Sequence, residues 1–252
     1  MTDPHFTIEP SAKRVRATIG DIVLADSIAT WLLIEGYAPV YYFPRDDVRT
    51  DLLRSSGRRT DSAGRGTADW WSVETPASVR DDVAWCFAQP EPDAELLADH
   101  IAFDWDKIDH WFEEDEEIFG HPRDPHHRVD VRASSRRVDV SLAGETIAST
   151  THGLFLFETG LPPRCYIPPE DVRSDLLSPS PTTSICPYKG NASYWHLRIG
   201  QHVIEDAVWS YRDPLPECPR IRNYYCFYDE KVDRIEVERP TPLTPGPAAG
   251  RH

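Results

Sequence analysis

The sequence has no long apolar run. No apolar stretch approaches the roughly 20 residues that a membrane-spanning helix needs. The opening segment, MTDPHFTIEPSAKR, lacks the apolar core of a secretory signal. We therefore expect a soluble cytoplasmic protein with no membrane partner.

Positive charge is also scarce. The 27 Lys and Arg residues are outnumbered by 42 Asp and Glu residues, which gives a net charge of −15. An acidic surface repels phosphate backbones and anionic lipid headgroups. The balance argues against nucleic acid as a partner, and no feature of the sequence identifies a protein partner.

Paired cysteines are absent as well. The chain has five cysteines, an odd number, and no two of them have the C-x-x-C spacing. Free thiols therefore fit better than a disulfide framework or a zinc site. The histidines of HPRDPHH (121–127) lack the spacing of metal ligands on a helix or hairpin. We expect neither a bound metal nor a cofactor.

The chain is rich in aromatic residues and proline, and it repeats itself once. Eight Trp, ten Tyr and nine Phe can build large cores, while 23 Pro favour turns over long helices. The stretch APVYYFPRDDVRTDLL (38–53) matches PPRCYIPPEDVRSDLL (162–177) at an offset of 124. The match continues downstream, with Trp71 on Trp195 and Trp85 on Trp209. Upstream, RVRATIGDIVLAD lies over RVDVSLAGETIAS at an offset of 123.

This repeat predicts two copies of one domain, at residues 14–118 and 137–238. Residues 119–136, with their prolines and histidines, are predicted to be an ordered connector. The tail, 239–252, is rich in Pro and Gly and is predicted to be disordered.

Each copy reads mostly as strand. RVDVSLAG alternates polar and apolar residues, and ETIAST follows after a glycine turn, as in a hairpin. PPEDVRSDLL breaks the alternation, and its leading prolines and early acids suit a single helical turn. We predict a mainly β protein: two tandem small all-β barrels or rolled sheets, each with one short helical turn.

The pattern ETG-PP-Y-P-EDVR-DLL, then CPYKG-A-YW and AVWSY-DPLPE, resembles the bacterial and fungal family known as domain of unknown function 427. The resemblance covers both copies. The family has sometimes been labelled nucleotidyltransferase-like, which would imply paired carboxylates for Mg²⁺ beside a phosphate-holding Gly-Ser loop. DWD (104–106) has the carboxylate spacing, but no Gly-Ser precedes it. We interpret it as a hairpin turn with solvated acids.

The loop CPYKG (186–190) is the main candidate site. A lysine three residues from Cys186 can stabilise a thiolate and so create a nucleophile. The alternative is a rigid turn, in which Pro187 and Gly190 set the backbone and Cys186 packs as a small apolar residue. Lys189, just before the glycine, is placed to meet an anion. The first copy reads SAGRG (62–66), which keeps the cation and glycine but has Ser62 and Gly64 in place of Cys186 and Tyr188.

Other candidates surround this loop. Glu158 ends a strand and could serve as a general base or as the ion partner of Lys189. Arg173 could grip a carboxylate or phosphate, or it could pair with Asp175 to fasten the helical turn. Three aromatic residues complete the predicted pocket, with core packing as the alternative for the tryptophan: Tyr194, Trp209 and Tyr211.

These residues favour a small polar or anionic ligand site in the second copy. Its binding residues would be Arg173, Tyr188, Lys189, Tyr194, Trp209 and Tyr211, and its catalytic residues Cys186 and Glu158. The alternative function is a non-catalytic scaffold or protein-interaction module built on the duplicated domain.

Overall fold

The computed structural model describes residues 6–239, and the chain divides into two compact units at residues 126 and 127. Each unit contains one copy of the repeat. The predicted tail at 239–252 lies, except for Arg239, outside the described residues.

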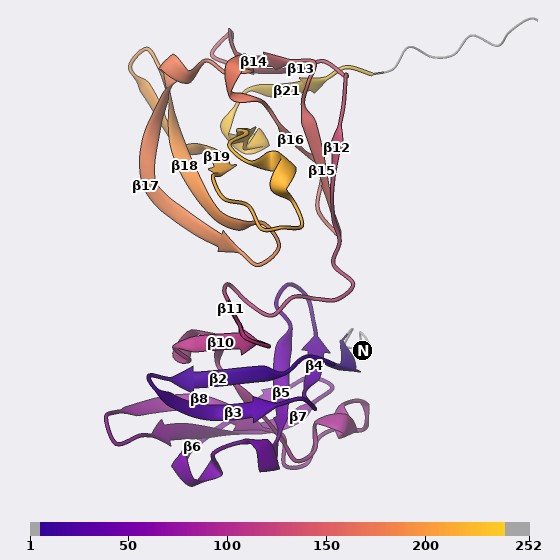
Figure 1. Ribbon diagram of the computed structural model, residues 1–252, viewed down its shortest axis with the longest axis vertical. Helices are drawn as coiled ribbons and strands as arrows, with labels where there is room; N and C mark the ends of the chain where they lie inside the picture. The colour runs from indigo at the N-terminus through magenta and orange to yellow at the C-terminus, as the bar shows by residue number, and fades with distance from the viewer. Residues whose placement is uncertain (1–5, 240–252) are drawn as a thin grey trace, which may run out of the picture. The chain divides into compact units, whose positions relative to one another are not determined.

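The first unit is built from eleven described strands and four short 3-10 turns (Figure 1). The strands are β1 (Thr7–Pro10), β2 (Val15–Ile19), β3 (Ile22–Ser27), β4 (Trp31–Ile34), β5 (Val40–Pro44), β6 (Leu53–Ser62), β7 (Gly66–Glu74), β8 (Val79–Cys86), β9 (His100–Phe103), β10 (His110–Glu113) and β11 (Glu116–Ile118). The turns are η1 (Arg45–Asp47), η2 (Thr50–Leu52), η3 (Pro92–Leu97) and η4 (Trp105–Lys107).

The second unit repeats this order, without a described counterpart of β11, in ten described strands and four 3-10 turns. The strands are β12 (Val129–Ala133), β13 (Val138–Leu142), β14 (Glu145–Thr150), β15 (Leu154–Glu158), β16 (Arg164–Tyr166), β17 (Leu177–Cys186), β18 (Gly190–Ile199), β19 (His202–Tyr211), β20 (Cys226–Phe227) and β21 (Arg234–Val237). The turns are η5 (Pro169–Asp171), η6 (Ser174–Leu176), η7 (Pro219–Ile221) and η8 (Asp229–Lys231).

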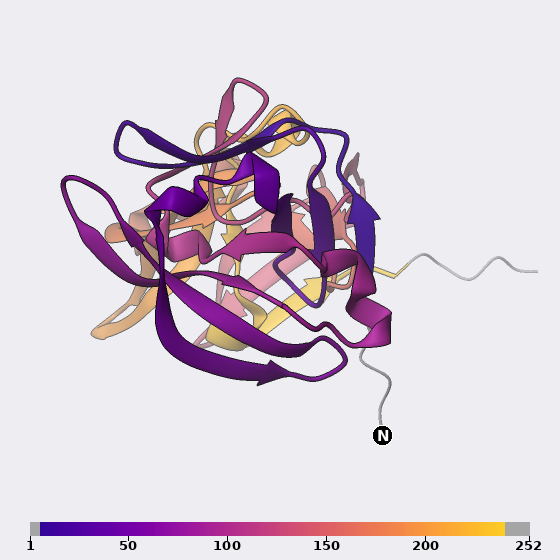
Figure 2. The same cartoon turned by 90° about the horizontal axis from the view of Figure 1, so that it is seen from below.

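The strands form curved antiparallel sheets. In the first unit the order β1-β4-β5-β9-β8-β7-β6 makes one seven-stranded sheet, and β11-β10-β2-β3 makes a second. The curvature of these strands, coloured from indigo to magenta, is visible in Figure 2. In the second unit the sheets are β12-β15-β16, β14-β13-β21 and β17-β18-β19-β20. A bridge between Ile167 and Tyr225 joins two of them, where Phe43 pairs with Ile101 in the first unit. The predicted mainly β, rolled-sheet, two-copy architecture is confirmed.

One strand of each copy lies outside the predicted limits of the repeats. Strand β1 precedes residue 14, and β12 lies within the segment predicted as a connector. Both pair with equivalent strands in the same register: Ile8 is opposite Leu33, and Val131 is opposite Leu156. The structural repeat therefore continues upstream at an offset of 123, although TIEP and VDVRA share too few residues to reveal it.

The predicted helical turn of the second copy is two consecutive 3-10 turns, η5 and η6, with a matching pair, η1 and η2, in the first. Pro168 and Pro169 begin η5. The fixed φ of proline suits the first residues of a helical turn, where a backbone N–H would have no hydrogen-bond partner within the turn. None of the helical turns in residues 6–239 is long or apolar enough to cross a membrane.

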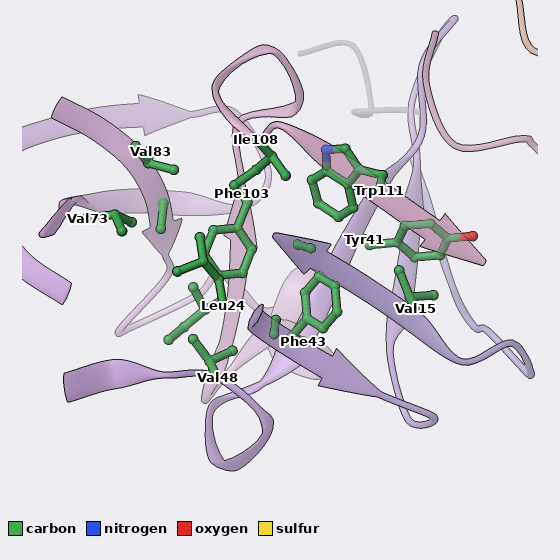
Figure 3. Close-up of a cluster of buried hydrophobic side chains, with 14 of the residues drawn as sticks. Val15, Leu24, Tyr41, Phe43, Val48, Val73, Val83, Phe103, Ile108 and Trp111 are labelled. Atoms are coloured by element: carbon green, nitrogen blue, oxygen red, sulfur yellow. The ribbon is translucent and has the colours of Figure 1, made fainter. Parts of the chain in front are cut away.

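Each unit has its own apolar core. In the first, Phe43 is completely buried and its ring lies 5.8 Å from that of Phe103 and 6.2 Å from that of Trp111 (Figure 3). In the second, Ile167 and Phe227 lie at the equivalent core positions. A separate aromatic cluster in the second unit, which includes Trp209 and Tyr211, lies next to the CPYKG loop.

Candidate functional site

The CPYKG loop is the tip of a β-hairpin. Cys186 at the end of β17 pairs with Gly190 at the start of β18, and the Lys189 N–H donates to the Cys186 carbonyl at 3.3 Å. The Lys189 carbonyl in turn accepts from the Leu215 N–H at 3.1 Å. The tip is therefore held from both sides by backbone hydrogen bonds.

Glycine at the start of β18 is required by the backbone. Gly190 has φ +97°, and a Cβ there would lie 3.3 Å from the Asp213 carbonyl oxygen. Gly66 in the first copy has φ +98°, and a Cβ there would lie 3.0 Å from the Gln89 carbonyl oxygen. Any other residue would combine an unfavourable φ with a backbone contact. The glycine that both copies share thus belongs to the fold.

A buried ionic group lies beside this loop. Lys189 Nζ donates to Glu158 Oε2 at 2.5 Å, and their side chains are only 10% and 8% exposed. The other carboxylate oxygen, Oε1, lies 3.1 Å from His127 Nε2. The sequence placed Glu158 and Lys189 in one pocket, and the structure brings them into direct contact.

Tyr188 covers the group. Its ring stacks on the His127 ring with centroids 4.1 Å apart and planes at 24°. The Cys218 thiol donates to the Tyr188 carbonyl at 3.6 Å. Both the ring and the backbone carbonyl of Tyr188 therefore have a partner.

His127 is the member that the sequence did not assign to this site. No local motif places His127 in the site. Its position follows from the antiparallel pairing of β12 with β15, which places Val129 opposite Glu158. A histidine two residues before Val129 therefore reaches the carboxylate. Recognising this would have required a prediction of β12 and its pairing.

The predicted aromatic residues line the neighbouring interior. The Trp209 Nε1–H donates to the Tyr166 hydroxyl at 3.2 Å, and the Tyr194 and Ser184 hydroxyls are 2.7 Å apart. Tyr211 is buried, and this burial, with Cys186 and Glu158 nearby, raises the pKa of its hydroxyl far above the ordinary value. Tyr211 is therefore a neutral neighbour of the ionic group.

Arg173 is not brought into this group. Its guanidinium pairs with Asp175, with Nη2 at 2.6 Å from Oδ2, and both side chains are more than half exposed. Arg173 precedes the ten-residue strand β17, and Cys186 is the last residue of that strand. The two residues therefore lie at opposite ends of β17, which is a long curved strand (Figure 1). Arg49 and Asp51 form the same pair in the first copy. This geometry agrees with the alternative given above, in which Arg173 pairs with Asp175 to fasten the helical turn.

The first copy has its own version of the ionic group. Arg65 pairs with Glu35, and the Arg65 carbonyl accepts from the Glu91 N–H at 3.1 Å, as Lys189 accepts from Leu215. This pair is less buried, since the Glu35 side chain is 43% exposed. Each copy therefore contains a cation–carboxylate pair at this position, and the pair of the second copy is more deeply buried.

The acids of DWD lie at a turn. The Asp104 carboxylate accepts from the Asp106 N–H at 3.2 Å, at the start of η4. Within residues 6–239, the structure contains no group of three or more His, Cys, Asp and Glu side chains arranged to hold a metal.

All five thiols are free, but they differ in environment. Burial raises the pKa of Cys165 to about 12 and that of Cys218 to about 11, and the Cys226 pKa also lies well above its ordinary value. Cys186 is only partly buried. It is thus less buried than Cys218, the other thiol beside the loop.

We predict that iodoacetamide at pH 8 modifies Cys186 before Cys165, Cys218 and Cys226. Only thiolates react, and burial disfavours the thiolate form of the other three cysteines. Mass spectrometry of peptides after a short exposure checks the order. The Cys186→Ser variant is the control and should lose the first adduct. Equal labelling of Cys218 would contradict the prediction.

These features define a duplicated all-β protein with a cation–carboxylate pair at the hairpin tip of each copy. The family described as a domain of unknown function (DUF427) matches residues 7–114 and 130–238. The chain belongs to this family, as two tandem copies. No curated protein matches the sequence.

Proposed function

We propose that the second repeat binds a small polar ligand with a negatively charged group at Lys189, Glu158 and His127. The observation that carries the proposal is the burial of two opposite charges at the loop. Buried ion pairs contribute little net stability, because desolvation offsets their attraction. The burial of both charges therefore favours a role in ligand recognition or catalysis over a role in stability.

Lys189 supplies the positive charge for the ligand. An ammonium group has three N–H donors, and Glu158 accepts one of them. A carboxylate or phosphate oxygen of the ligand would accept another. In this partly dehydrated place the interaction gains strength over one in water.

Catalysis at the same site would use two neighbouring groups. Glu158, in contact with both Lys189 and His127, would accept a proton from the ligand and could exchange it with His127. Cys186 at the end of β17 would be the nucleophile. The ring of Tyr188 would limit the entry of water.

Titration with acetate, succinate and inorganic phosphate tests the proposal by NMR. We expect at least one anion to shift the backbone signals of residues 186–190 and the His127 ring, with a Kd of about 1 mM for so small a ligand. The double variant Glu158→Gln/Lys189→Met removes both charges together, which avoids leaving one buried charge unpaired. It should lose the response.

The control variant is Arg173→Ala, which removes a cation at the other end of β17 and should bind like the wild type. Equal binding by the double variant would overturn the proposal. A lack of any response, together with a stoichiometric protein partner recovered by pull-down, would favour the scaffold function instead.

A further inference from the structure

The first repeat contains a cavity of about 240 Å³ on its seven-stranded sheet. Residues of β4 and β5 line it on one side, and residues of β6, β7 and β8 on the other. Four aromatic residues form much of its wall: Tyr42, Trp70, Trp85 and Phe87. Arg65 and Glu35 provide its charged groups.

We propose that this cavity binds a small aromatic carboxylate, with the ring against the indoles and the carboxylate on Arg65. The site is separate from the ionic group of the second repeat. It lies in the copy whose loop has lost both the thiol and the tyrosine.

The hairpin tip beside this cavity differs from that of the second repeat. In the second repeat the Tyr188 ring stacks on His127 and covers the ionic group. Gly64 takes its place in the first repeat and brings no side chain to the loop beside Arg65. A different ring approaches the cation in the first repeat: the Arg65 guanidinium carbon lies 5.7 Å from the centroid of the Phe6 ring.

The aromatic wall suits a ring. The Trp70 indole N–H donates to Thr60 Oγ1 at 2.8 Å, and that of Trp85 donates to the Tyr42 hydroxyl at 3.1 Å. Both N–H groups are thus satisfied within the protein. A bound aromatic ring can therefore pack on these side chains, in offset or edge-to-face contact, without leaving either indole donor unpaired.

The polar groups suit a carboxylate. Arg65 Nη1 is the guanidinium nitrogen that contacts Glu35, and a guanidinium offers five N–H donors in a fixed fork. The Glu35 side chain is 43% exposed, so water weakens its electrostatic attraction to Arg65. Burial raises the pKa of Tyr42 to about 12, which keeps its hydroxyl protonated and able to donate to the ligand.

The volume of the cavity matches about one substituted ring. An apolar cavity of about 150 Å³ is known to hold benzene in another protein. The larger volume here leaves room for a ring with one short polar substituent. Benzoate is therefore the simplest probe.

Titration with benzoate should shift the indole N–H signals of Trp70 and Trp85 in the NMR spectrum, with a Kd of about 1 mM. The Arg65→Leu variant should weaken benzoate binding about tenfold, because it removes a charge-assisted contact. It should leave the binding of benzyl alcohol unchanged. Val40→Phe, which places a ring in the cavity, should abolish both.

Three outcomes would overturn the proposal: no movement of the two indole signals, equal benzoate binding by Arg65→Leu, or tighter binding of benzylamine than of benzoate. The last would indicate a cation site. The Glu158→Gln/Lys189→Met variant should bind benzoate like the wild type. This control separates failure here from failure of the site proposed in the second repeat.

Discussion

Replacing Lys189 by methionine is expected to destabilise the second repeat by about 3–5 kcal/mol. Removing one partner of a buried ion pair leaves an unpaired buried charge, and this is what makes the loss large. Glu158, with a side chain 8% exposed, would lose its cationic partner and keep its contact with His127. Chemical denaturation with hydrogen exchange on β18 measures the effect within this repeat.

The first repeat supplies the matched control. Arg65→Met breaks the equivalent pair, but Glu35 is 43% exposed and water can take over its solvation. We therefore expect a loss of about 0–1 kcal/mol, the range of exposed ion pairs. Equal losses in the two variants would contradict the assignment of burial as the cause. Reduced loss in Glu158→Gln/Lys189→Met, relative to Lys189→Met, would support it.

Replacing Phe43 by alanine is expected to destabilise the first repeat by about 3–5 kcal/mol. The side chain is completely buried between Phe103 and Trp111, so its removal loses apolar burial and leaves a cavity that neighbouring strands cannot fill. The free energy of unfolding, followed by hydrogen exchange on β5 and β9, measures the loss.

Phe119→Ala is the control in the same repeat, because Phe119 is 54% exposed. Its effect should stay within about 0.5 kcal/mol. A loss for Phe43→Ala no larger than that for Phe119→Ala would show that the core does not depend on this ring.

The fold was largely predictable, because its signals are local. Period-two alternation and glycine turns indicate strands and hairpins, and the offset of 124 made two copies evident. The glycine of the hairpin tip was also recognised as part of the fold. Strands β1 and β12 were missed because short edge segments contain little alternation and become strands through their partners.

The candidate site was predictable only in part. Glu158 and Lys189 lie 31 residues apart in sequence, and their meeting depends on how β15 and β17 are placed. His127 joins them through the pairing of β12, which no local pattern encodes. Arg173 illustrates the opposite case: it is near the loop in sequence, yet a full strand separates them in space.

The first-repeat cavity could not be derived from sequence. A change from tyrosine to glycine at residue 64 reads as the decay of a motif. Only the arrangement of five strands shows that a lined volume lies beside this loop. A repeat can thus lack the recognisable loop sequence and still contain a lined cavity.

The hydrogen bonds that hold each hairpin tip also affect how fast a ligand could come and go. Glu91 to Arg65 and Leu215 to Lys189 tie the tips to the segments that follow β8 and β19. A tip fastened in this way cannot swing aside as a gate. Entry and exit would then depend on side-chain rotations, and in the second repeat on rotation of the Tyr188 ring, which is 9% exposed and stacked on His127.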